Sequence, residues 1–433
     1  MDIPFFKPFI DYFEFAVGYI SHLTLWRLVE MFWFFLLLDL PRYILPDFFI
    51  LYNEWFHSNP MLNKPMPDHE LPFISVIVPA RNEEETIGLT INSLLESNFP
   101  ANKMEIIVVD DGSEDRTFRI AQAYSARGNV RVFKKSIRGG KASCLVYGLK
   151  AAKGAFIMSV DSDSTFDRDA LRNILKPFRN PKVGAVSGNV KVRNRAHNLL
   201  TRLQYCEYMT GISLGRRWLA YVNMLTIVSG AFGCFRRSVL EASGAWDPGI
   251  GDDSNVTLKT RKLGFRVGFA PDAIVMTNAP TTLKGLFKQR RRWNRSFIRN
   301  RLRKHKSIMN PLQFNIINLF AVIIPFFYRV VLLFTFFIYI IYTLLLDIKF
   351  YPIIFFLTWV LYSCSTLFSL TVSISFSERR REEWKILWYV PLMPFYRLYI
   401  RFARLYAYIQ EIFRLQYEEP FYPDKVWSQA PRW

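Results

Sequence analysis

Residues 74–113 read ISVIVPARNEEETIGLTINSLLESNFPANKMEIIVVDDGS, and this stretch carries the main indications of the fold. It holds two apolar runs, ISVIVP and EIIVVD, which are typical of buried β-strands, with the helical pattern EETIGLTINSLLES between them. Two further strands are expected in RVF, near Arg131, and in AFIMSVD at residues 155–161. Strands that alternate with helices predict βαβ units and an α/β, doubly wound parallel sheet.

Acidic side chains follow three of these strands. The polar residues at the strand ends are Arg81, Asn82 and Glu83, then Asp110 and Asp111, then Asp161 and Asp163. Ligands of open α/β sheets bind outside the carboxyl ends of the strands, so these side chains are expected at one crevice. Several carboxylates repel one another unless a cation joins them, and Mg²⁺ or Mn²⁺ suits oxygen ligands beside phosphate. Each acidic pair alone is more often a turn than a site, but their joint placement favours a metal site.

Other nucleotide and metal motifs are excluded by inspection. The segment IRGGKAS at residues 137–143 lacks the P-loop spacing, and no GxGxxG follows the first strand. DSDSTF at residues 161–166 fails as an EF-hand because its sixth position is Phe166. Lys141 either approaches a phosphate at a helix N-terminus or is a solvated lysine, and the sequence leaves both open.

Two later segments also carry chemistry. The first is Gly251-Asp252-Asp253, which follows the loop-like stretch SGAFGCFRRSVLEASGAWDPGI and opens the helical pattern SNVTLKTRKLG. One acidic residue there either caps the helix or serves as a general base that takes a proton from a hydroxyl group.

The second segment, residues 281–306, holds eleven basic residues and no acidic one. At helical spacing one face is expected to carry Gln289, Arg292, Trp293 and Ser296, and the other faces Arg290, Arg291 and Arg295. Arginine suits a diphosphate and tryptophan the apolar face of a sugar ring, whereas the outer basic faces suit anionic lipid.

The composition predicts contact with a bilayer, because 51% of the 433 residues are apolar and 17% are aromatic. Residues 9–26 either cross the membrane or lie in its interface, and residues 29–52 are expected to cross. A short interfacial segment after Pro311 is expected to precede a span at residues 330–346, and the uncharged residues 351–376 form the clearest span. Residues 386–415 predict an amphipathic interfacial helix. The predicted domains are therefore 1–52, membrane segments; 53–310, a cytosolic domain; 311–415, membrane and interfacial helices; and 416–433, an extended tail.

Charge and cysteine usage limit the setting. The net charge of +20 fits an anionic partner, but the basic residues cluster beside membrane segments, which argues against nucleic acid and for a lipid bilayer. SERRREEWK, after residue 376, marks a cytoplasmic flank. The four cysteines form no CxxC pair, so neither a zinc site nor a disulfide framework is expected. The N-terminus shows no secretory signal, and Met1 is taken as the mature start.

The ordered motifs PARNEEETI, IVVDDGSEDRT, SVDSDS, GDDSNVT and QRRRW resemble the processive family 2 membrane glycosyltransferases, the group of cellulose, hyaluronan, chitin and poly-N-acetylglucosamine synthases. The resemblance covers residues 74–303 and implies a GT-A-like domain. It also implies a multi-pass protein of the plasma (inner) membrane, with the catalytic domain in the cytosol and the C-terminal helices forming a channel. A single active copy and a homo-oligomer are both compatible with that layout.

The resemblance assigns roles residue by residue. Asp111, with Asp110 beside it, would hold the uridine of a UDP-sugar donor, and Asp161 and Asp163 would hold the metal that bridges the diphosphate. Asp253 matches the general base. Gln289, Arg292 and Trp293 match Gln-x-x-Arg-Trp, in which the polar pair contacts the diphosphate and the Trp stacks on the acceptor. Gly-Asp-Asp is similar to the hyaluronan-synthase form rather than the Thr-Glu-Asp of cellulose synthases, so UDP-GlcNAc and UDP-glucose both remain open as donor, as does alternation with UDP-glucuronate.

The resulting expectation is a processive, inverting synthase that polymerises the UDP-sugar into a β-linked polysaccharide and extrudes it across the membrane. One alternative is a transferase that adds a single sugar to a membrane lipid. The other is a catalytically inactive membrane scaffold, which the intact acidic motifs argue against.

Overall fold

The computed structural model describes residues 7–22, 24–56, 66–346 and 351–413. The predicted tail at 416–433 lies outside them. The chain divides into two compact units, one within Met1–Phe48 and Phe327–Arg397 and the other within Phe49–Phe326 and Leu398–Trp433. The second unit contains the motifs at residues 74–303 on which the family resemblance rests.

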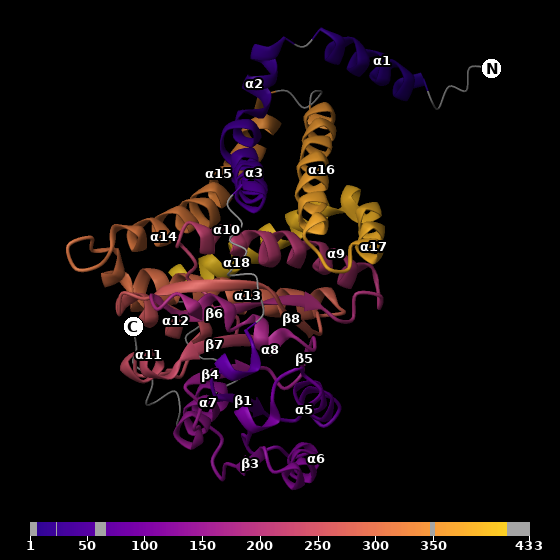
Figure 1. Ribbon diagram of the computed structural model, residues 1–433. Helices are drawn as coiled ribbons and strands as arrows, with labels where there is room; N and C mark the ends of the chain where they lie inside the picture. Colours follow the sequence, from indigo (N-terminus) through magenta and orange to yellow (C-terminus); the bar gives the residue numbers. More distant parts are fainter. Residues whose placement is uncertain (1–6, 23, 57–65, 347–350, 414–433) are drawn as a thin grey trace. The chain divides into compact units, whose positions relative to one another are not determined.

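The second unit is built on one mixed sheet, whose strands lie in the order β3-β2-β1-β4-β7-β6-β8-β5 (Figure 1). The strands are β1 (Ile74–Ala80), β2 (Met104–Asp110), β3 (Val130–Lys134), β4 (Phe156–Val160), β5 (Thr165–Phe166), β6 (Val183–Val192), β7 (Phe232–Arg236) and β8 (Arg266–Thr277). The four strands expected from the sequence are β1 to β4, and they pair in parallel as expected.

The expectation of an entirely parallel sheet is wrong. Strand β7 runs antiparallel to both β4 and β6, and β5 runs antiparallel to β8. The segment interpreted as a loop, residues 229–250, holds β7 and the helix α11 (Arg237–Ala242). Its glycines are the reason for the misreading: Gly233 lies within β7, where a Cβ would meet the Val228 side chain at 2.5 Å, so the position admits no side chain.

Besides α11, further helices belong to the second unit. They are α5 (Ile87–Leu95), α6 (Thr117–Ala123), α7 (Gly140–Ala151), α8 (Ala170–Asn173), α9 (Leu199–Tyr208), α10 (Gly215–Tyr221), α12 (Asp252–Lys262), α13 (Leu283–Ile298) and α14 (Ile316–Phe326). Helix α7 approaches β1 closely, since a Cβ on Gly148 would lie 2.4 Å from a methyl carbon of Ile77. Apolar residues of β1, β2 and α7 share one core cluster with Phe235 and Trp246. That packing fixes the carboxyl ends of β1 and β4 relative to the start of α7.

The first unit is helical. Its elements are α1 (Lys7–Ser21), α2 (Leu25–Trp33), a π-helical turn (Phe34–Asp39), the first part of α3 (Leu40–Phe56), a second π-helical turn (Phe327–Val331), α15 (Leu332–Leu346), α16 (Tyr351–Ser375), α17 (Arg380–Glu383), a 3₁₀ segment (Trp384–Leu392) and the start of α18 (Met393–Ile412). Asp39 and Asp47 are buried there, and each accepts a hydrogen bond from a hydroxyl of α16, from Tyr362 and Ser369 respectively. Burying a carboxylate is costly without such partners, so these two contacts fix how α16 packs on residues 39–47.

Two helices among the described residues are long and apolar enough to cross a bilayer, Ile316–Leu345 and Tyr351–Ser375. The second covers residues 351–375 of the expected span at 351–376, and the first covers residues 330–345 of the expected span at 330–346. Residues 29–52, expected to cross, do not reach that standard because Glu30, Asp39, Arg42 and Asp47 fall within them.

Candidate active site

The acidic pair that ends β2 is held by its own chain. Asp111 accepts hydrogen bonds from the Lys135 ammonium at 2.9 Å and from the backbone amides of Gly139 at 2.8 Å and Gly140 at 2.7 Å. Asp110 is fully buried and accepts from the backbone and hydroxyl of Ser113. Asp111 therefore fixes the loop that leads into α7 and places Lys141 in the first turn of that helix, whereas Asp110 fixes the turn at Ser113.

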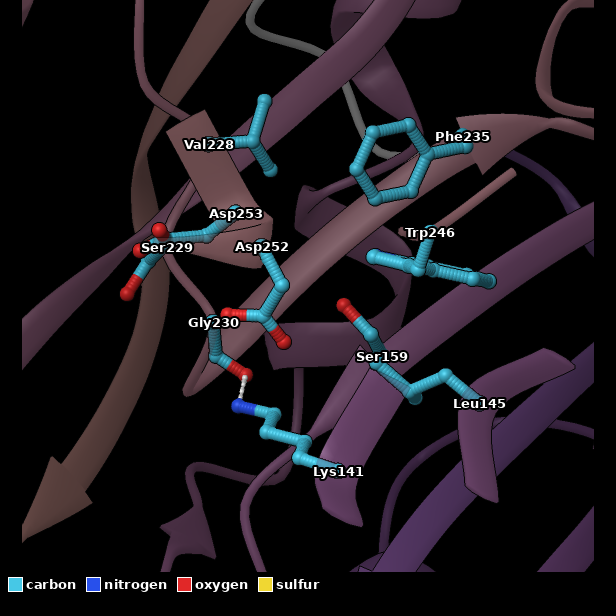
Figure 2. Close-up of a pocket in the computed structure, with 10 residues that line it drawn as sticks. All are labelled: Lys141, Leu145, Ser159, Val228, Ser229, Gly230, Phe235, Trp246, Asp252 and Asp253. Atoms are coloured by element: carbon cyan, nitrogen blue, oxygen red, sulfur yellow. Dashed lines mark hydrogen bonds between the residues drawn. The ribbon is translucent and has the colours of Figure 1, made fainter. Parts of the chain in front are cut away.

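Lys141 lies between two sets of carboxylates. Its ammonium is 2.5 Å from an oxygen of Asp161 and donates to the Gly230 carbonyl at 3.2 Å. Figure 2 shows this second bond and the side chain of Asp252 directed toward Lys141. Burial opposes the charged form of Lys141, but the neighbouring aspartates outweigh it and raise its pKa. Of the two interpretations left open, the structure favours a lysine held inside the site over a solvated one.

Asp161 and Asp163 occupy the turn after β4. Burial, and next to it the charge of Asp161, raise the pKa of Asp163. Burial also raises the pKa of Glu83, which follows β1, and Asp163 and Asp161 add to that rise. Carboxylates from two of the three expected strand ends therefore lie close enough to interact electrostatically, and Lys141 neutralises part of their charge.

These carboxylates fit a divalent cation only in part. No three His, Cys, Asp or Glu side chains in the described ranges converge as a metal centre on their own. Mg²⁺ in particular binds through one or two carboxylates together with substrate phosphates. The oxygen donors of Asp161 and Asp163 match a cation that binds together with a diphosphate.

Asp253 lies in the first turn of α12, beside a pocket lined by Lys141, Leu145, Ser159, Val228, Ser229, Gly230, Phe235, Trp246, Asp252 and Asp253 (Figure 2). One of its oxygens accepts from the backbone amide of Ser254 at 2.7 Å. Burial and then the charge of Asp252 raise the pKa of Asp253, whereas Lys141 opposes the rise. A carboxylate whose pKa is raised above its ordinary value is suited to accept a proton.

Arg216, on α10, is a residue that the sequence did not single out. Burial lowers the pKa of Arg216 to about 10, and the charge of Asp253 opposes that change. Its guanidinium donates to the Ser187 hydroxyl at 2.9 Å, and the same oxygen accepts from the backbone amide of Ser229. Arg216 thus adds positive charge beside Asp253 and holds the wall of the pocket. No local sequence pattern around Arg216 indicates that it lies beside Asp253, which is 37 residues later in the chain.

The Gly-Asp-Asp turn is fixed against α13. Gly251 has φ +72°, and a Cβ there would lie 2.6 Å from the Ser296 side chain. Asn300 donates to the Gly251 carbonyl at 2.8 Å and to the Ser254 hydroxyl at 2.6 Å. Glycine is required for both the backbone conformation and the close approach. The helix that carries QRRRW therefore sets the position of Asp253.

The expected inward face of α13 is only partly correct. Ser296 is buried against Gly251, and Gln289 is half-buried, with a carbonyl oxygen that has no hydrogen-bond partner in the described part of the chain. Arg292 is exposed, and Trp293 is 40% exposed. Arg292 and Trp293 are therefore open to a ligand.

Arg290 and Arg295 lie on other faces of the helix, as expected, but those faces are buried rather than free for anionic lipid, since the two residues are 3% and 4% exposed. Helical periodicity showed which residues share a face but not which carboxylates elsewhere would neutralise a buried arginine. For Arg290 that partner is Glu207 of α9, at 2.6 Å.

Glu411 of α18 is the partner of Arg295. It is 2% exposed and accepts from Arg295, Arg299 and Arg303 at 3.0, 3.0 and 3.1 Å. One buried carboxylate of α18 therefore binds both the C-terminal half of α13 and the π-helical turn that follows it, Arg299–Lys304.

Comparisons with known proteins agree with this architecture. The family model "Glycosyltransferase like family 2" matches residues 72–296. The fold is GT-A-like and the protein is a glycosyltransferase. The chain belongs to glycosyltransferase family 2, which confirms the family expected from the motifs.

The individual relatives share at most a third of their aligned residues with this chain. The chain is 33% identical over 222 residues to a poly-β-1,6-N-acetyl-D-glucosamine synthase of Staphylococcus epidermidis, covering 51% of this chain and 53% of the relative. It is 33% identical over 226 residues to the synthase of the same name from Staphylococcus aureus, covering 52% and 54%. The chain thus spans about half the length of these curated relatives. Among solved structures, a mannosyltransferase from Pyrobaculum calidifontis in complex with GDP-Man and Mn²⁺ aligns with a TM-score of 0.56 at 20% identity, covering 87% of this chain and 97% of that one.

Proposed function

We propose that the protein is a processive, inverting glycosyltransferase that polymerises a UDP-sugar into a β-linked polysaccharide and passes it across the membrane. The observation that carries this is the joining of two parts of the site: the Gly251 turn, which presents Asp253, is packed on the helix that presents Gln289, Arg292 and Trp293. A proton acceptor and an exposed aromatic ring on adjoining elements suit an acceptor sugar that stays bound between additions.

The proposed chemistry needs one displacement. The acceptor hydroxyl oxygen attacks the anomeric carbon, its proton passes to Asp253, and the bond from that carbon to the diphosphate breaks, releasing UDP with inversion of an α-linked donor. Lys141, Gln289 and Arg292 would bind the diphosphate. Asp161 and Asp163 would hold Mg²⁺ or Mn²⁺, which supplies positive charge for the departing diphosphate. Asp111 would shape the uridine end through the loop that it fixes, with Asp110 beside it.

N-acetylglucosamine is the proposed sugar, with glucose second, because the two named relatives are synthases of an N-acetylglucosamine polymer. We further propose that the two long apolar helices cross the plasma membrane and that the catalytic unit faces the cytosol, where UDP-sugars are made. The growing polysaccharide and the bilayer are then the partners of this chain.

The test uses the full chain in detergent with UDP-GlcNAc, UDP-glucose and UDP-glucuronate, singly and paired, with Mg²⁺, Mn²⁺ or EDTA. UDP release and product size are measured together, with Asp253→Asn as the inactive control. A polymer from UDP-GlcNAc alone supports the proposal. A single glycolipid product would indicate single addition instead, and the absence of UDP release with every donor would overturn the proposal that this chain uses one of these three UDP-sugars.

A further inference from the structure

The exposed Trp293 ring has one face covered from within the protein. The guanidinium carbon of Arg290 lies 4.2 Å from the centre of the Trp293 ring and 5.9 Å from that of Tyr208, whose own ring centre is 6.5 Å from that of Trp293. Arg290 is 3% exposed, whereas Trp293 is 40% exposed. The indole therefore rests on a buried cation and offers its remaining surface outward.

Arg290 is itself held from another helix. The Glu207 carboxylate of α9 accepts from its guanidinium at 2.6 Å. Arginine presents a planar fork that can bind a carboxylate at its edge while stacking an aromatic ring on its face, which lysine cannot do. Glu207 and Arg290 together form a clamp that joins α9, α13 and the Trp293 ring.

A buried ion pair adds little stability to the packing of two helices, because an apolar pair of similar volume often stabilises the protein as much or more. A planar cation stacked on a ring does something that an apolar pair does not: it holds the ring in one orientation with one face closed. Catalytic geometry depends on such orientation, since small displacements of a bound reactant lower the rate steeply.

We propose that Glu207 and Arg290 are positioning residues that fix the Trp293 indole so that the sugar at the growing end of the acceptor stacks on its open face. This inference rests on the proposed function, because it concerns the acceptor sugar of that reaction. It assigns neither residue a contact with the reacting atoms. It requires that loosening the clamp harm transfer to an acceptor and leave donor hydrolysis unchanged.

The first variants are Arg290→Lys, which keeps the charge opposite Glu207 but loses the planar group, and Glu207→Gln, which removes the charge that holds Arg290. The matched control is Arg291→Gln, at the adjacent position. For each protein, the ratio of glycosyl transfer to water-driven UDP-sugar hydrolysis is measured with an added oligosaccharide acceptor, together with the acceptor KM, product length and Tm. We expect the transfer-to-hydrolysis ratio of both clamp variants to fall by between about 2-fold and 30-fold, the range for a cation–π contact, with shorter products and an unchanged hydrolysis rate.

A double variant separates positioning from packing. Glu207→Arg combined with Arg290→Glu restores an ion pair between the helices but places an anion under the indole. If the pair only joins the helices, the double variant recovers both Tm and transfer; if it positions the ring, Tm recovers and transfer does not. Recovery of transfer, or equal losses of transfer and hydrolysis in the single variants, would overturn the proposal. A wild-type protein that adds one sugar only would refute polymerisation, while the transfer-to-hydrolysis ratio of the variants would still decide the role of the clamp.

Discussion

His305 should make the catalytic unit sensitive to acid. Its Nε2 lies 2.7 Å from the Asn255 side-chain oxygen. The Asn255 amide nitrogen donates to Asp247, so its oxygen is the acceptor and Nε2 of His305 must carry the hydrogen. The other ring nitrogen, Nδ1, is buried with no hydrogen-bond partner in the described residues. A proton added there would find no acceptor.

The size of the effect follows from the shift in pKa. Burial, followed by the charges of three nearby lysines, lowers the pKa of His305 from 6.5 to about 3; the lysines are Lys262, Lys304 and Lys259. Because the folded state takes up this proton less readily than the unfolded state, the contribution to stability is complete above pH 6.5 and is lost as the pH falls toward 3. At pH 5, 1.5 pH units below the unfolded value, the loss is about 2 kcal/mol at ~1.4 kcal/mol per pH unit.

The assay compares thermal and denaturant unfolding of the wild type with His305→Gln between pH 7 and pH 4, in one detergent. Glutamine can still donate to Asn255 but does not titrate, so the stability difference between the two proteins should shift in favour of the variant by about 2 kcal/mol from pH 7 to pH 5. Carboxylates common to both proteins cancel in that difference. The matched control is His197→Gln, because His197 is exposed and should follow the wild-type profile. Parallel profiles for wild type and His305→Gln would refute the reasoning.

Four further substitutions test the site and its supports. Asp253→Asn should keep nucleotide binding and lower turnover by about 10²-fold to 10⁴-fold, as expected for loss of a general base; near-normal UDP release would place the base elsewhere. Asp163→Ala should weaken UDP binding, measured by calorimetry, when Mn²⁺ is present but not when EDTA removes the metal. If the variant binds UDP as tightly as the wild type under both conditions, Asp163 is not a metal ligand. Gly251→Ala should lower the free energy of unfolding by at least about 1 kcal/mol for the left-handed backbone alone. It should also slow turnover, because the added methyl group would contact Ser296. An unchanged free energy of unfolding would contradict this packing. Glu411→Gln should cost about 3–5 kcal/mol by leaving three arginines without their buried carboxylate, whereas a cost below about 1 kcal/mol would mean that solvent already screens the cluster.

Local sequence pattern was enough to predict the first half of the sheet and the edge at which the candidate site lies. Apolar runs ending in Asp110 and Asp161 predicted parallel strands β2 and β4, and parallel strands place their carboxyl ends on one side. Both the strand assignment and the side on which the polar groups gather depend on residues that are close together in the sequence. The ordered motifs likewise predicted the family, which is confirmed for residues 72–296.

Tertiary structure alone decided the rest. Strand β7 is inserted between β4 and β6 in the opposite direction, and its glycines read locally as a loop. Arg290 reads as one of several surface cations on a basic helix, yet it is buried because Glu207, 83 residues earlier, meets it. Periodicity fixes which residues share a helix face, but which face is buried depends on partners distant in the chain, and those contacts form only when the chain packs.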